Sequence, residues 1–188
     1  MAYPSKEWKV LELFFNEATK HWHFHNIVKS AKISDVVANK WLKKYCTDKL
    51  INRIKPKGKM PYYIANWDNG QYHNTKRLYA INKLYESGLI YKLQTLKKAK
   101  TIVIFGSFVR TDWHAKSDID IFIFGDPEEF RFGTIWDGLG MQGKSREISV
   151  HSFPTLQKIR SIHSGLMKNV VKGFFIKGSI HDIAEVKA

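Results

Sequence analysis

The sequence predicts an α+β protein in two parts. Residues 5–48 repeat apolar side chains at helical spacing, and two short strand patterns follow them. Further along, the unbroken apolar runs 101–105 and 121–124 predict buried strands. Residues 68–75 between these parts are polar and turn-prone, so we place the boundary there and expect domains at residues 1–70 and 71–188.

Three short helices are expected in the first part, because apolar residues recur there every three or four positions. Their apolar faces are Trp8, Leu11, Phe14 and Phe15; then Phe24, Ile27, Val28 and Ala31; then Val37, Trp41 and Tyr45. Ser34 is placed to cap the third helix. Lys40, Lys43 and Lys44 fall on the remaining surface of that helix.

Two strands are expected next, at residues 50–54 and 62–65, joined by a loop rich in proline, glycine and lysine. Three helices followed by such a hairpin resemble the winged helix-turn-helix family over residues 5–67. The resemblance implies DNA contact, with the third helix in a major groove and the hairpin on phosphates. The candidate DNA-binding residues are Lys40, Lys43, Lys44, Lys57 and Lys59. The alternative is a dimerisation or protein-docking module.

Two helices are expected at the start of the second part, one through residues 78–85 and one after Gly88. After the strand at 121–124, the run Gly-Asp-Pro-Glu-Glu at residues 125–129 predicts a turn and the start of a helix. In the first part, His21, His23 and His25 alternate at a helix start without a fourth ligand nearby. We therefore expect them in surface or capping roles rather than as a metal site.

The chain has a net charge of +14, from 31 basic and 17 acidic residues among 188. Residues 1–70 hold 13 basic and 6 acidic residues, and the remainder holds 18 and 11, so the excess is not confined to a tail. Such a charge favours a polyanionic partner, and the alternative is a lysine-rich solvated surface. A single cysteine, Cys46, excludes an internal disulfide and a thiolate zinc site. With no run of about 18 apolar residues and no signal pattern, we expect a soluble, cytoplasmic protein without a membrane segment.

The residues between the two buried strands predict phosphate and metal chemistry. Gly106 and Ser107 end the first strand, where a glycine turn that opens a helix can present backbone N–H groups to phosphates. Asp118 lies just before the second strand and Asp120 lies at its start. Side chains two residues apart on a strand share a face, so the two carboxylates should point the same way. Two adjacent carboxylates repel each other unless a cation lies between them, and carboxylate oxygens are ligands for Mg²⁺.

These residues also carry a resemblance to a known family. Phe105-Gly106-Ser107-Phe108-Val109-Arg110, followed by Ser117-Asp118-Ile119-Asp120-Ile121, resembles the DNA polymerase β-like nucleotidyltransferase superfamily, closest to its minimal nucleotidyltransferase branch. The resemblance covers roughly residues 76–180. It implies a nucleotidyltransferase domain with a small mixed sheet flanked by helices.

The resemblance also implies roles for individual residues. Asp118 and Asp120 would hold two Mg²⁺ ions, and the Gly106 turn with Ser107 would hold the β- and γ-phosphates. A third carboxylate on a later strand corresponds to Glu147, as a metal ligand and a base for the attacking hydroxyl. The alternative for Glu147 is a surface residue paired with Arg146. Arg110 and Lys116 would add positive charge at the phosphates, or would be solvated loop residues.

Two functions follow from these residues. The first is transfer of a nucleoside monophosphate from ATP or another nucleoside triphosphate to a hydroxyl acceptor. The acceptor would be a partner protein (as in antitoxin members paired with HEPN-type toxins), a small molecule or a nucleic-acid end. The second is a DNA-binding transcriptional regulator whose nucleotidyltransferase-like domain senses nucleotide or serves as a scaffold. A pure protein-docking adaptor would leave the Asp118–Asp120 pair without a role.

Overall fold

The computed structural model describes residues 5–161 and 164–183 and divides into two compact units, Met1–Tyr79 and Ala80–Ala188. The predicted boundary at residue 70 is the first residue of helix α4 (Gly70–Glu86), whereas the division between the two units falls within that helix, after Tyr79. Within the described ranges, every helix is too short or too polar to span a bilayer.

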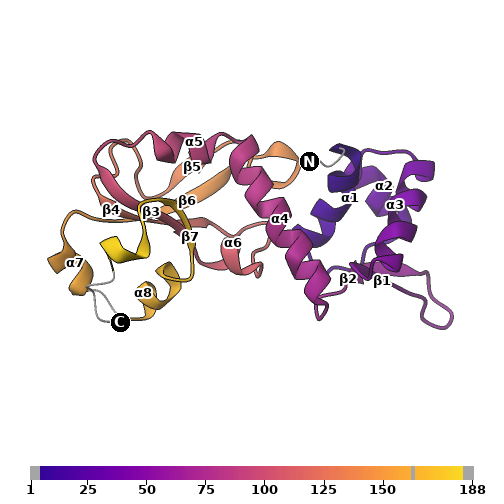
Figure 1. The fold of residues 1–188 in the computed structure, drawn as a ribbon. Coiled ribbons are helices and arrows are strands. Elements are labelled where there is room, and N and C mark those ends of the chain that lie inside the picture. Colours follow the sequence, from indigo (N-terminus) through magenta and orange to yellow (C-terminus); the bar gives the residue numbers. More distant parts are fainter. Residues whose placement is uncertain (1–4, 162–163, 184–188) are drawn as a thin grey trace. The chain divides into compact units, whose positions relative to one another are not determined.

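The first unit contains three helices and a two-stranded antiparallel hairpin, in the predicted order, followed by the first part of α4 (Figure 1). Its elements are α1 (Ser5–Asn16), α2 (Phe24–Ala31), α3 (Asp35–Thr47), β1 (Ile51–Ile54) and β2 (Tyr62–Ala65). The predicted cap is confirmed, because the Ser34 hydroxyl accepts a hydrogen bond from Val37 N at 3.5 Å. The hydroxyls of Tyr45 and Tyr72 donate to backbone carbonyls of α1 at 2.9 Å and tie the helices together.

The predicted apolar face of α3 is partly wrong. The buried side chains of this helix are Ala38, Leu42 and Tyr45, whereas Val37 and Trp41 are only half-buried. The small Ala38 packs inside, while the Trp41 ring stays at the rim and stacks on Tyr45. The prediction is right for Tyr45, whereas Ala38 and Leu42 are buried in place of their neighbours Val37 and Trp41.

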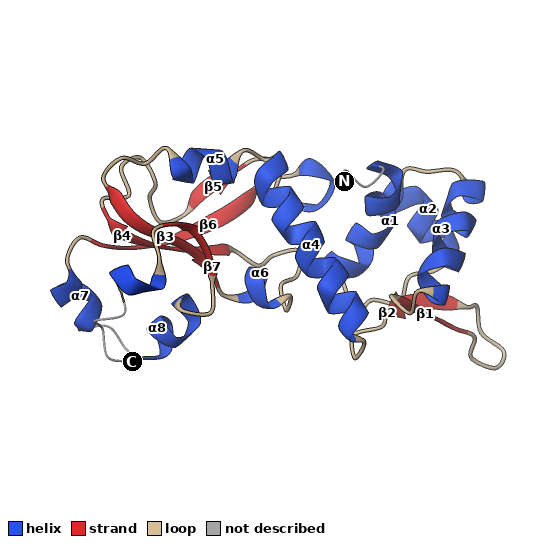
Figure 2. Cartoon of the chain, in the orientation of Figure 1, coloured by secondary structure: helices blue, strands red, loops and turns tan. Residues whose placement is uncertain are grey.

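The second unit is built on a mixed sheet, as the resemblance implies, and this sheet has five strands (Figure 2). The strand order is β5-β6-β4-β3-β7, with β4 and β6 parallel and the other pairs antiparallel. The strands are β3 (Ala99–Phe105), β4 (Ile119–Gly125), β5 (Thr134–Trp136), β6 (Arg146–Phe153) and β7 (Phe174–Lys177). The helices are α5 (Leu89–Gln94), α6 (Ser107–Arg110), α7 (Leu156–Arg160) and α8 (Ser164–Val170), with short 3₁₀ turns at Met141–Gly143 and Ile180–Asp182.

The two faces of this sheet have different compositions. Ile102, Ile104, Ile119, Ile121 and Ile123 alternate onto one face and are all fully buried. The other face holds a core cluster in which Val103, Phe105 and Phe122 pack against side chains of α7 and α8. Figure 1 shows α5 on one side of the sheet and α7 and α8 on the other. Because the core cluster fills only part of its face, the start of β4 is left for polar side chains.

No helix begins after β4, so that part of the prediction is wrong. Residues 126–130 form a turn, and Glu128 has a positive φ of 53°, which an α-helix cannot contain. The Asp126 side chain accepts a hydrogen bond from Glu128 N at 2.8 Å and closes a local turn instead. The chain then enters the short edge strand β5.

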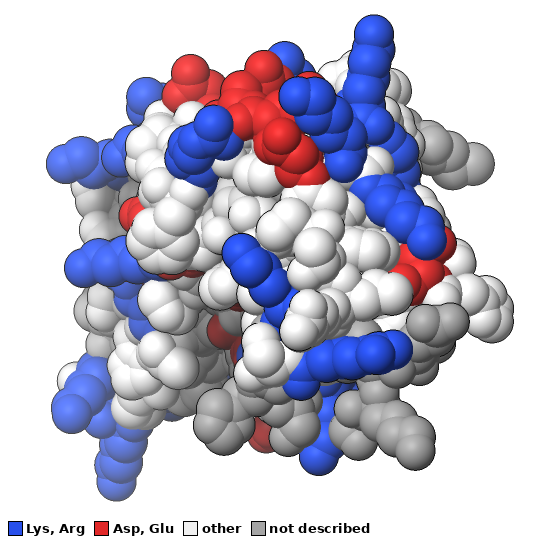
Figure 3. Space-filling model, turned by 90° about the vertical axis from the view of Figure 1, so that its left-hand side faces the viewer, with Lys and Arg blue, Asp and Glu red and all other residues white. Residues whose placement is uncertain are grey.

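The basic character of the sequence is visible on the surface. Figure 3 views the molecule from the left-hand side of Figure 1. Lysine and arginine side chains project over much of this face, whereas the acidic side chains are fewer and gather mainly near its upper edge. Over the whole chain the sequence places a net charge of +7 in residues 1–70 and +7 in the remainder, so the excess is not confined to one segment.

Candidate active site

The predicted glycine-serine turn lies where β3 ends. Gly106 has φ 77° and ψ −153°, a conformation that glycine adopts readily and other residues avoid. Ser107 then begins α6, a single short turn of helix, and Arg110 N donates to Gly106 O at 3.2 Å. The first N–H groups of α6 have no partner within the helix, so they are available to an anion.

Asp120 lies directly beside this turn. In the register of the sheet it pairs with Phe105 on β3 and with Ser149 on β6. A Cβ atom built on Gly106 would lie 2.1 Å from Asp120 Oδ2, so the carboxylate is packed against the glycine backbone. Position 106 therefore requires glycine for two reasons: the backbone has a positive φ, and the Asp120 carboxylate approaches too closely for a Cβ atom.

Asp118 is the residue immediately before β4, and its side chain is exposed to solvent. The Ser149 hydroxyl lies 3.3 Å from Asp118 Oδ2 and donates a hydrogen bond to it. His151 Nε2 lies 3.8 Å from Asp120 Oδ1, and the His151 ring packs against Phe105. Two side chains of β6 thus contact the two carboxylates predicted from the sequence.

Glu147 lies on β6, two residues before Ser149 and on the same face of the strand. It pairs with Ile135 of the edge strand β5, and its Oε1 would lie 3.6 Å from a Cβ built on Gly133. Arg146 points to the opposite face, because successive strand side chains alternate. Glu147 therefore lies on the same face of the sheet as Asp120, and a surface pair of Glu147 with Arg146 is disfavoured.

The carboxylates do not form a ready-made metal cage. Within residues 5–161 and 164–183, no three His, Cys, Asp or Glu side chains lie close enough together to hold a metal ion. Asp118 and Asp120 nevertheless present hard oxygen donors from the start of one strand. Mg²⁺ commonly takes only one or two protein carboxylates and completes its shell with substrate phosphates and water. The donor set fits Mg²⁺ bound together with a triphosphate.

Arg146 has a structural role that the sequence did not reveal. It is 5% exposed, and its guanidinium donates to the backbone carbonyls of His114, at 2.9 Å, and Ser117. It also lies 5.6 Å from the ring centroid of Phe108 and 5.4 Å from that of Trp113. The arginine therefore fixes the loop that leads into Asp118. The only signal for it in the sequence was a basic residue directly before the candidate acid Glu147.

The two predicted phosphate-binding cations differ in their surroundings. Arg110 is half-exposed and reaches Asp112 Oδ2 at 3.3 Å and Asn169 Oδ1 of α8 at 3.4 Å. It therefore links α6 to α8, and its charge is partly compensated by Asp112. Lys116 is exposed in the loop before Asp118, where its backbone N donates to His114 Nδ1 at 3.2 Å. Of the two, Lys116 is the cation with the less constrained side chain.

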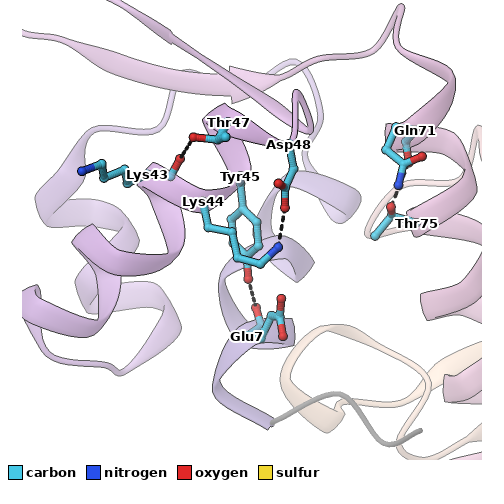
Figure 4. A network of polar contacts seen from close by, with 8 residues as sticks. All are labelled: Glu7, Lys43, Lys44, Tyr45, Thr47, Asp48, Gln71 and Thr75. Atoms are coloured by element: carbon cyan, nitrogen blue, oxygen red, sulfur yellow. Dashed lines mark hydrogen bonds and ion pairs between the residues drawn. The ribbon is translucent and has the colours of Figure 1, made fainter.

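The candidate DNA-binding lysines of α3 also differ from one another. Figure 4 shows Lys43 pointing away from the Tyr45 ring, whereas the ammonium of Lys44 is directed at Asp48, with which it forms an ion pair. Lys44, Asp48 and Glu7 line a pocket of about 310 Å³. Burial raises the pKa of Glu7, and the nearby Lys44 ammonium opposes this effect. The Lys44 ammonium is therefore directed at Asp48 in this pocket rather than out into solvent.

The other four candidates remain at the surface. Among the described residues, no ion pair engages Lys40, Lys43, Lys57 or Lys59, and all four side chains are exposed. The Lys40 ammonium lies 5.3 Å from the ring centroid of Trp41. Lys57 and Lys59 are in the loop between β1 and β2.

Comparison with known families bears on the second unit. Residues 88–176 match the family described as Polymerase beta, Nucleotidyltransferase, and this segment is just under half of the chain. The match includes the Gly106 turn, Asp118, Asp120 and Glu147, and it supports the DNA polymerase β-like superfamily and a general nucleotidyl transfer activity. No curated protein and no solved structure matches the chain. The first unit lies outside the matched segment, so its winged-helix assignment stays a prediction.

Proposed function

We propose that the second unit is a metal-dependent nucleotidyltransferase. It moves a nucleoside monophosphate from ATP or another nucleoside triphosphate to a hydroxyl acceptor. The observation that carries the proposal is the contact of the Asp120 carboxylate with the Gly106 backbone, because it joins the phosphate turn to the metal-binding carboxylates at one point. The family match over residues 88–176 supports the same reaction class.

The triphosphate would bind at the turn between β3 and α6. The first N–H groups of α6 and the Ser107 hydroxyl face the β- and γ-phosphates in this arrangement, and Gly106 allows the phosphates to approach the backbone. Lys116 adds positive charge from the neighbouring loop. Bound by Asp118, Asp120 and the phosphates, two Mg²⁺ ions would supply charge neutralisation at the α-phosphate and at the departing pyrophosphate.

The reaction is an in-line displacement. The acceptor oxygen bonds to the α-phosphorus while the bond from that phosphorus to the bridging oxygen breaks, and pyrophosphate leaves with both bonding electrons. The acceptor proton passes to the Glu147 carboxylate, which lies on the sheet face of Asp120. Ser149 keeps the Asp118 carboxylate oriented through its hydrogen bond.

The acceptor belongs to one of three classes: a hydroxyl on a partner protein such as a HEPN-type toxin, a small molecule, or a nucleic-acid end. The exposed position of Asp118 is compatible with a large acceptor, since the carboxylate is not enclosed by the chain. Each class gives a labelled product of a different size, so one gel and one thin-layer separation distinguish them.

The test is incubation of the full chain with α-labelled nucleoside triphosphates, Mg²⁺ and candidate acceptors. We expect label transfer by the parent protein and none by Asp118→Asn or Asp120→Asn. The matched control is Asp126→Asn, at the far end of the same strand, where an asparagine oxygen can still accept the Glu128 N–H. No transfer from any of the four nucleotides, or equal transfer by the Asp118 and Asp120 variants, would refute the proposal.

A second candidate function rests on the first unit, which we propose binds DNA in the manner of a winged helix. Residues 49–67, which include the hairpin, hold five basic residues and no acidic one. Lys40 and Lys43 on α3 add exposed charge without an ion-pair partner among the described residues. If the protein is instead a transcriptional regulator with a nucleotide-sensing or scaffold domain, DNA binding persists in the Asp118→Asn/Asp120→Asn double variant while transfer is absent from the parent. A salt titration of duplex binding measures the phosphate contacts.

A further inference from the structure

A groove outside the proposed transfer site lies at the loop end of the β1–β2 hairpin. Its volume is about 430 Å³, within the range of small-ligand sites. The groove is lined by His21, His23, Pro56, Lys59, Met60 and Tyr62. Three rings and one ammonium group, that of Lys59, therefore line a single open surface in the first unit.

The backbone explains why two histidines face this groove. Trp22 pairs with Tyr63 as an antiparallel bridge, with hydrogen bonds of 2.9 and 2.8 Å in the two directions, so the segment around Trp22 adds to the edge of β2. Side chains alternate along an extended chain, and residues opposite each other point to the same side. Trp22 is 3% exposed and points inward, which directs His21 and His23 outward on the same side as Tyr62.

The rings on this side form a stack. The His21 and Tyr62 rings are 3.9 Å apart between centroids with an interplanar angle of 16°, and His23 meets Tyr62 edge-on at 6.4 Å. His23 Nδ1 lies 3.0 Å from Pro61 O and fixes the histidine against the hairpin. His21 is exposed, and among the described residues its only ring contact is with Tyr62. The outer face of His21 is therefore open to a further planar group.

The charge around the groove has one sign. Neither residues 18–34 nor residues 49–67, the two segments that form it, contain an acidic residue. Lys59 lines the groove itself, and Met60 beside it is 75% exposed. An exposed stack of rings edged by cations is the arrangement that binds unpaired bases and their phosphates.

We infer that this groove binds single-stranded nucleic acid, with an unpaired base extending the His21–Tyr62 stack and the adjacent phosphate at Lys59. A base in a duplex has both faces covered by its neighbours, so only an unpaired base offers a face to His21. The inference stands apart from the nucleotidyl transfer reaction and differs from duplex binding by α3.

The test is fluorescence anisotropy of the full chain with labelled oligothymidine and oligouridine of about 12 nucleotides and a duplex of the same length. His21→Ala should weaken single-strand binding about fivefold or more, and His21→Phe, which retains a planar ring, should stay within about twofold of the parent. Lys59→Ala should lower the slope of log affinity against log salt by about 0.7. Lys97→Ala, which removes one exposed lysine from the second unit, is the charge-matched control. It should change neither the affinity for single strands nor the salt slope.

Three results would overturn the inference: no single-strand binding by the parent at low salt, equal weakening by His21→Ala and His21→Phe, or equal weakening of duplex and single-strand binding by His21→Ala. The two oligonucleotides show whether the groove prefers DNA or RNA. Transfer activity measured on the same variants separates this inference from the proposed reaction. The His21 variants should keep transfer to an acceptor other than nucleic acid. Asp118→Asn should lose transfer and keep oligonucleotide binding.

Discussion

The carboxylate of Asp120 is packed against the backbone of Gly106, so that a Cβ on Gly106 would come within 2.1 Å of Asp120 Oδ2. This contact exists because Asp120 pairs with Phe105, the residue before the glycine, across the β3–β4 ladder. The antiparallel register thus brings a phosphate-binding turn and a carboxylate to the same place. Any side chain at residue 106 must displace the carboxylate.

Gly106→Ala should therefore abolish transfer. The added methyl group cannot fit beside Asp120, and displacing a reacting group by about 1 Å costs on the order of 100-fold in rate. We expect a loss of at least about that size in the labelled-nucleotide assay, with the far-ultraviolet circular dichroism spectrum retained. The matched control is Gly143→Ala, since Gly143 has a similar φ of 76° but nothing within 4 Å of its Cβ position. Equal activity in the two alanine variants would contradict the role given to the Asp120 contact.

Ser149→Ala should weaken the affinity of the transfer site for Mg²⁺ rather than remove activity. The hydroxyl donates to Asp118 Oδ2 at 3.3 Å, and loss of a partner that orients a metal ligand typically costs 10- to 100-fold in metal affinity. The Mg²⁺ concentration for half-maximal transfer should rise about tenfold, while the rate at saturating Mg²⁺ changes little. Ser152→Ala on the same strand is exposed and should leave the titration unchanged. An unchanged Mg²⁺ titration for Ser149→Ala would mean that the hydrogen bond does not orient Asp118.

Arg146→Met should destabilise the second unit. Without the guanidinium, the carbonyls of His114 and Ser117 each lose a partly buried hydrogen bond from a charged donor, and such a bond is typically worth about 1.5–3 kcal/mol. We expect the free energy of unfolding in urea to fall by about 2–4 kcal/mol. Arg131→Met is the control, because Arg131 is exposed and should change the value by less than about 1 kcal/mol. Similar losses in both variants would show that burial of Arg146 adds nothing.

Glu7→Gln should stabilise the first unit at neutral pH. Burial raises the pKa of Glu7, so the folded state holds this proton more tightly than the unfolded chain. The resulting penalty is absent below the unfolded pKa of 4.5 and is fully present above the raised folded value. The glutamine variant should melt at a higher temperature than the parent at pH 7.5, and the difference should shrink toward pH 4. Glu17→Gln removes a charge that is paired with Lys20 at the surface and should not raise the melting temperature. If the difference in melting temperature between Glu7→Gln and the parent did not change with pH, a raised pKa of Glu7 could not be its cause.

Local patterns predicted most elements of the chain. The apolar runs of β3 and β4, the three N-terminal helices and the Ser34 cap each depend on a few neighbouring residues, so a short window contains the needed information. The two failures were also local in origin. Spacing alone did not distinguish Val37 and Trp41 from their buried neighbours Ala38 and Leu42 in α3. The helix expected near Glu128 was prevented by a positive φ, which composition does not reveal.

The sequence by itself determined which residue types carry the proposed chemistry: the glycine-serine turn, the Asp118–Asp120 pair and the basic hairpin are visible as spacing and charge. Only the tertiary structure decided which of them meet. The contact of Asp120 with Gly106, the hydrogen bond from Ser149, the buried position of Arg146 and the His21–Tyr62 stack all join segments distant in sequence. Such contacts depend on strand register, and a shift of one residue would turn each of these side chains to the opposite face.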